Sequence, residues 1–123
     1  MTTMIYITKP AIRNLVAYRG ATFYDAFTFK DTAGNPVDLT GWKARYNAWP
    51  KGSPDNTAAA IALTSTPAAG ITLGGAAGTV IITSAAATQP PAMQYDHQFE
   101  FEDAAGATQI YYIGTLDLRE DIP

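Results

Sequence analysis

The chain has 123 residues, enough for one domain with a single hydrophobic core. Hydrophobic residues make up 47% and charged residues 15% of the sequence, which is typical of a packed globule and excludes a disordered chain. The net charge of -3, with no run of Lys or Arg, argues against nucleic-acid binding, and the absence of cysteine excludes disulfides and Cys-based zinc sites.

The first 18 residues are expected to form an N-terminal extension or an edge strand. They lack the basic region and long apolar stretch of a signal peptide, and no apolar run in the chain approaches the roughly 20 residues of a membrane span. The stretch from Ile5 to Val16 is rich in strand formers but is broken by Pro10, which cannot donate to a sheet ladder. Because so many apolar side chains are unexpected in a solvated tail, Ile5 and Ile7 are candidate interface residues.

Residues 22–30 alternate with period two, which predicts a half-buried strand. Its apolar face carries Phe23, Phe27 and Phe29. Asp25 lies on the same face and breaks the pattern. Residues 31–36 are dense in turn formers, so a turn is expected to follow.

Residues 42–49 alternate again, and one face carries Trp42, Ala44, Tyr46 and Ala48. The polar face carries Lys43, Arg45 and Trp49. Exposed Trp and Arg are common anchors of protein interfaces, so these three residues are candidate interface residues. An equally weighted alternative is that Trp49 is covered by the loop at residues 50–57.

Residues 58–64 are compatible with a strand or with a short helix, since Ala favours helix. The alternation of Ile61 and Leu63 favours the strand. Residues 71–73 and 79–83 flank a glycine-rich segment and predict a hairpin.

One helical turn is expected over residues 84–89, because Ser84 can cap it and Pro90 can stop it. Two long alternating segments follow, residues 95–102 and residues 108–118, with a turn at Asp103–Gly106 between them. They predict a hairpin whose inner faces carry Tyr95, His97, Phe99 and Phe101 on one strand and Tyr112, Leu116 and Leu118 on the other.

Seven to nine short strands without a βαβ pattern predict an all-β antiparallel sandwich over residues 19–123. The same residues offer little for catalysis. His97 is the one histidine, and its strand places it among aromatic side chains. Asp25 and His97 could meet in the core as a structural pair, they could form an acid–base dyad, or they could be two unrelated residues at the rim of the core. The sequence has no calcium loop and no phosphate-binding loop, so we expect neither an enzyme nor a cofactor.

Three segments carry a resemblance to a known family. They are RGATF at residues 19–23, PVDLTGWKAR at residues 36–45 and GITLGGAAGTV at residues 70–80. Together with the last hairpin, they resemble the N-terminal domain of phage baseplate upper proteins and related stand-alone phage structural proteins, over roughly residues 19–118. The chain departs from that pattern in its N-terminal extension and in Asp25, where an apolar residue is usual.

The resemblance implies an immunoglobulin-like sandwich in a virion, assembled in the host cytoplasm in the tail, baseplate or fibre-attachment region. The implied partners are other phage structural proteins and further copies of the chain, with no nucleic acid and no membrane. Two alternatives stay open. One is a capsid decoration protein, and the other is a host-surface carbohydrate-binding module that uses Trp49 and Tyr111 as platforms. The family has no catalytic residues to transfer.

Overall fold

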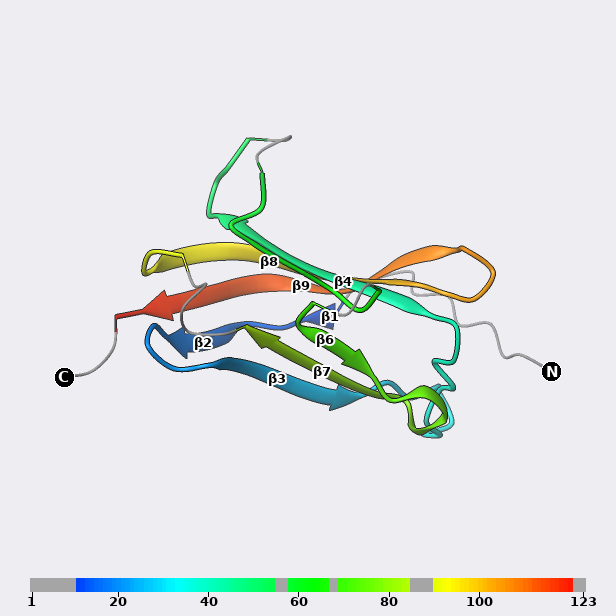
Figure 1. Ribbon diagram of the computed structural model, residues 1–123. Coiled ribbons are helices and arrows are strands. Elements are labelled where there is room, and N and C mark those ends of the chain that lie inside the picture. The colour runs from blue at the N-terminus through cyan, green and yellow to red at the C-terminus, as the bar shows by residue number, and fades with distance from the viewer. Residues whose placement is uncertain (1–10, 55–57, 67–68, 85–89, 121–123) are drawn as a thin grey trace.

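Strands dominate the computed structural model, which describes residues 11–54, 58–66, 69–84 and 90–120 (Figure 1). They are β1 (Ala11–Ile12), β2 (Leu15–Tyr18), β3 (Phe23–Thr28), β4 (Lys43–Pro50), β5 (Ile61–Thr64), β6 (Ile71–Leu73), β7 (Thr79–Ser84), β8 (Met93–Glu102) and β9 (Thr108–Arg119). The larger sheet has the order β1-β9-β8-β4-β5, with β2 also beside β9, and the smaller sheet has the order β3-β7-β6. The two sheets face each other, so the predicted all-β sandwich is confirmed.

The core lies between the sheets, where the alternating faces of their strands meet. The most deeply buried side chains include Tyr46 of β4, Phe99 of β8 and Tyr112 of β9. Phe27 and Trp42 pack against the margin of this cluster and are partly buried. The apolar residues assigned to inner faces therefore lie in the core or against it, among them Phe23, Phe27, Phe29, Trp42, Tyr46, Phe99, Phe101, Tyr112 and Leu116.

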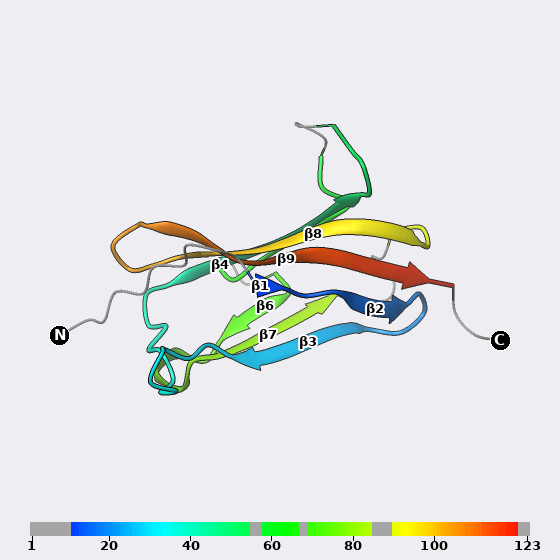
Figure 2. The same cartoon turned by 180° about the vertical axis from the view of Figure 1, so that it is seen from behind.

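The N-terminal strands lie along one edge of the larger sheet, beside β9, as Figure 2 shows from behind. Both run parallel to β9, with Ala11 opposite Tyr112 and Leu15 opposite Leu116. These two strands precede residues 19–123, for which the antiparallel sandwich is predicted, and they add a parallel edge to it. After β2 the chain turns at Gly20 (φ 88°) into β3 of the other sheet. β2 and β9 are far apart in the sequence and are not joined by a hairpin. No turn between them therefore requires the two strands to run antiparallel.

The remaining connections agree with the sequence in most places. β5 is a strand and not a helix, and it pairs antiparallel with β4. A short 3-10 turn, Gly75–Ala77, joins β6 to β7. The helical turn expected from residue 84 is wrong at its start, because Ser84 is the buried last residue of β7. Its other residues, 85–89, lie outside the described part of the chain.

Candidate functional site

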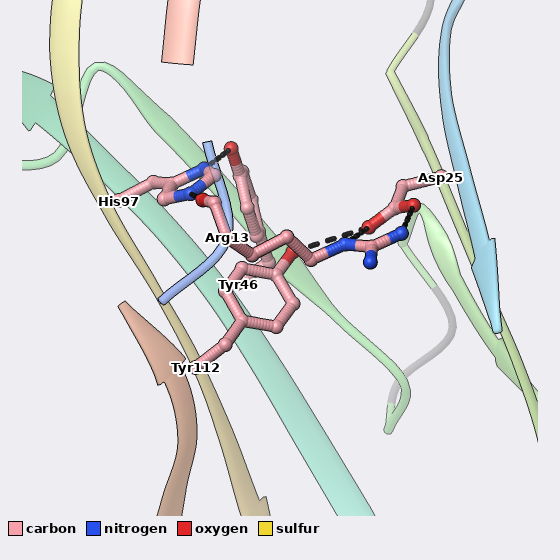
Figure 3. A network of polar contacts seen from close by, with 5 residues as sticks. All are labelled: Arg13, Asp25, Tyr46, His97 and Tyr112. Carbon is pink, nitrogen blue, oxygen red and sulfur yellow. Dashed lines mark hydrogen bonds and ion pairs between the residues drawn. The ribbon is translucent and has the colours of Figure 1, made fainter. Parts of the chain in front are cut away.

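A polar cluster lies inside the sandwich, and Arg13 is its central residue (Figure 3). From the connection between β1 and β2, the guanidinium donates to both carboxylate oxygens of Asp25 on β3, at 3.0 Å from Nε and 2.5 Å from Nη2. It also lies 5.6 Å from the ring centre of Phe27 and 5.9 Å from that of Tyr112. The hydrogen bonds to Asp25 raise the pKa of Arg13. The buried carboxylate is thus paired with a cation, as a buried charge requires.

His97 occupies the other side of the cluster and has both ring nitrogens bonded. Nε2 lies 2.6 Å from the backbone carbonyl oxygen of Arg13, and Nδ1 lies 2.8 Å from the hydroxyl of Tyr46. A carbonyl can only accept, so Nε2 carries a hydrogen, and in the neutral imidazole, which burial favours, Nδ1 accepts from Tyr46. Burial lowers the pKa of His97 and raises that of Tyr46. The geometry describes a neutral, fully bonded core histidine.

Asp25 and His97 do come near each other, but they are linked through a third residue. Arg13 binds Asp25 with its side chain and His97 with its carbonyl. The direct pair considered from the sequence is therefore wrong, and so is the acid–base dyad that it would form. Arg13 was not singled out by the sequence. The one sequence signal that pointed to such a residue was Asp25 on an aromatic face, because a buried carboxylate needs a cationic partner. The sequence does not indicate which of the eight Lys and Arg residues is that partner.

Gly114 makes room for this link. It lies opposite His97 on β9, and a Cβ added to it would be 2.3 Å from the carbonyl oxygen of Arg13. Directly after Arg13, the side-chain oxygen of Asn14 accepts from the backbone N–H of Thr115 at 3.0 Å. Through the contacts of Arg13, the segment between β1 and β2 is bonded to β3 of the smaller sheet and to β8 of the larger sheet.

The candidate interface residues of β4 lie on the outer face of the larger sheet, as the alternation predicts. Lys43 pairs with Glu102 at 3.7 Å and Arg45 pairs with Glu100, both across to β8. Exposed pairs of this kind contribute about 0–1 kcal/mol to stability. Trp49 is half-buried, so it is neither fully outward nor fully covered. Ile5 and Ile7 lie outside the described residues.

Tyr111 does not project outward as a binding platform would. Phe99 lies opposite Tyr112, whereas the next residue, Glu100, lies opposite Ile110, so Tyr111 is the extra residue of a β-bulge. The bulge turns Tyr111 inward beside Tyr112, where its ring stacks on Phe27 at 5.3 Å. The interpretation of Tyr111 as an outward platform is therefore wrong.

An exposed apolar strip follows the edge of the larger sheet. It comprises four aliphatic residues, with exposed fractions of 66% for Ile12, 54% for Val16 and 37% each for Ile110 and Ile113. Ile12 and Ile113 are direct partners across β1 and β9. We call these four residues the apolar edge strip. In a regular strand, Ile110 and Ile113 would lie on opposite faces, because they are three residues apart. The bulge at Tyr111 places them on the same face, so alternation alone does not predict this strip.

The described residues include an uncharged groove but no metal-binding group. No three His, Cys, Asp or Glu side chains among them gather into a group that could hold a metal ion. A groove of about 390 Å³ beside Trp42 is lined by Leu39, Thr40, Gly41, Trp42, Ser65, Thr66, Ile71, Thr72, Leu73 and Gly75, none of them charged. In this described part of the chain, no helix is long and apolar enough to cross a membrane.

No protein-family model matches the chain, and no curated protein matches it in sequence.

Proposed function

We propose that this chain is a structural protein of a bacteriophage virion, located in the tail, baseplate or fibre-attachment region, and that it acts by protein–protein assembly. The apolar edge strip carries the proposal. Exposed aliphatic side chains grouped at a sheet edge are typical of a surface that another protein covers. The resemblance of residues 36–45 and 70–80 to phage baseplate proteins supplies the virion context.

The proposal treats the chain as a binding protein and not as an enzyme. Its one histidine has both nitrogens engaged within the core, so it has no free nitrogen to take a proton from a substrate. The exposed Lys43 and Arg45 are each paired with a carboxylate, which favours a mixed, neutral surface over an anion-binding one.

We further infer that the sandwich is immunoglobulin-like. Its smaller sheet, β3-β7-β6, opposes the run β9-β8-β4-β5, which corresponds to the B-E-D and G-F-C-C′ strands of immunoglobulin domains. The hydroxyl of Tyr95, near the start of β8, donates to the carbonyl of Pro91 at 2.6 Å, as in the tyrosine corner of those domains. His97 follows two residues later, where antibody domains have a cysteine of their inter-sheet disulfide. The Arg13 cluster then takes the place of that disulfide.

Fractionated particles test the proposed function. Phage particles would be separated into tails and heads, and each fraction would be searched for this chain by mass spectrometry. We expect the chain in the tail fraction. Its presence in heads alone would favour capsid decoration, and its absence from both, with glycan binding by the isolated protein, would favour the carbohydrate-binding module.

A further inference from the structure

Among the residues that the structure describes, none pairs with the outer side of the edge formed by β1 and β2. Within the described residues, both strands pair only with β9. The backbone N–H groups of Arg13 and Arg19 donate to β9 at 2.9 and 2.8 Å. Alternate residues of a strand direct their N–H and C=O groups to opposite edges, so those of Val16 point away from β9. Val16 therefore offers both backbone groups and an exposed side chain to an added strand.

From residue 11 to residue 18, this edge lacks the features that usually protect an edge strand. Charged side chains, especially Lys, and prolines commonly block such edges. β2 reads LVAY and carries no charge, and the side chain of Arg13 is drawn inward to Asp25. Leu15 and Ala17 pack on the core, while Val16 and Ile12 are the exposed side chains.

The sequence directly before this edge favours a strand. The ten residues that precede Ala11 include the apolar, strand-favouring run Met4–Ile7, MIYI. An extended segment of ten residues reaches roughly 33–36 Å, far enough to leave its own domain. The sequence has Lys9 before Pro10; a residue before proline favours extended conformations, and Pro is disfavoured at the third position of a type I turn. Both effects disfavour a tight reversal of the segment onto its own edge.

We propose that residues 4–7 of one copy add as a strand to the β1–β2 edge of a second copy. In a strand, Ile5 and Ile7 lie on one face about 7 Å apart. On the same face as the exposed Ile12 and Val16, these two side chains would extend the apolar edge strip. The inference rests on the proposed function, because it supplies the contact through which the assembly protein meets its own copies. Each copy gives one segment and accepts another, so two copies can exchange segments as a dimer, or more copies can join as a ring or a chain.

The test uses the full-length chain and sedimentation equilibrium over a wide concentration range. Val16→Lys places a charge on the accepting edge, and the double variant Ile5→Asp, Ile7→Asp disables the donated segment. Tyr24→Lys is the matched control, because Tyr24 is 63% exposed on the other sheet. We expect each of the first two variants to weaken self-association at least about tenfold, with the control unchanged and circular dichroism spectra preserved.

Mixing the two defective variants gives the sharper result. The Val16→Lys copy keeps an intact segment, and the double variant keeps an intact edge. Their equimolar mixture should recover association but stop at one-to-one heterodimers. A wild-type chain that stays monomeric at every concentration, or a mixture that does not associate, would overturn the inference. So would a double variant that loses stability as a monomer while its self-association is unchanged, since the segment would then cover its own domain.

The two proposals fail separately. If the chain is found in the tail fraction but none of the three variants changes its self-association, the proposed function stands and this contact is refuted. Chains that associate as described but are absent from particles would retain the contact and remove the virion role.

Discussion

Replacing Arg13 with Met tests the buried cluster, because it removes the cation and keeps an apolar stem of similar length. Breaking a fully buried ion pair costs about 3–5 kcal/mol, since the remaining charge is left without a partner. The Asp25 side chain is 7% exposed but the Arg13 side chain is 39% exposed, so water already screens part of the pair. We therefore expect Arg13→Met to lower the free energy of unfolding by about 2–3 kcal/mol, which is a fall in Tm of roughly 6–15 °C at this chain length.

The reverse change should cost less. After Asp25→Leu, the half-exposed guanidinium can turn to water, whereas the carboxylate left by Arg13→Met cannot. The double variant, Arg13→Met with Asp25→Leu, replaces the pair by apolar groups and should recover most of the loss. Urea unfolding of the wild type and the three variants gives the coupling energy. A cost below about 0.5 kcal/mol for Arg13→Met, or additive effects in the double variant, would refute this account of the cluster.

Four further changes have distinct expected outcomes. Gly114→Ala should cost about 1–3 kcal/mol, because its Cβ would meet the Arg13 carbonyl oxygen at 2.3 Å; wild-type stability would contradict this. Phe99→Ala should cost about 3–5 kcal/mol in urea unfolding, since Phe99 is fully buried, and a cost below about 1 kcal/mol would mean that the packing is misassigned. Trp49→Ala should reduce incorporation into particles while the chain stays folded, and normal incorporation would remove Trp49 from the interface. Because burial lowers the pKa of His97 below 6.5, the unfolded chain takes up that proton first, and wild-type stability should fall from pH 7 to pH 5 more steeply than in His97→Gln; equal slopes would contradict this.

The core could be predicted because alternation alone assigns strand faces. Tyr46 and Phe99 were placed on inner faces from period two, and they are direct partners across β4 and β8. The position of His97 among aromatic side chains followed in the same way. Such assignments need only local sequence, since a strand turns each successive side chain to the opposite face.

The cluster and the apolar edge strip could not be predicted in the same way. Arg13 reaches Asp25 from another sheet, and its carbonyl reaches His97 only because Gly114 lies beside it. These contacts depend on the parallel register with β9, which no local pattern encodes. The bulge at Tyr111 is a similar case, because one extra residue reverses the faces on either side of it.

A density map of the intact particle tests the central claim most directly. The account predicts this sandwich in the tail, baseplate or fibre-attachment region, with Ile12 and Val16 of each copy covered by a neighbouring subunit. A particle that lacks the chain, or one in which the β1–β2 edge of every copy faces solvent, would contradict it.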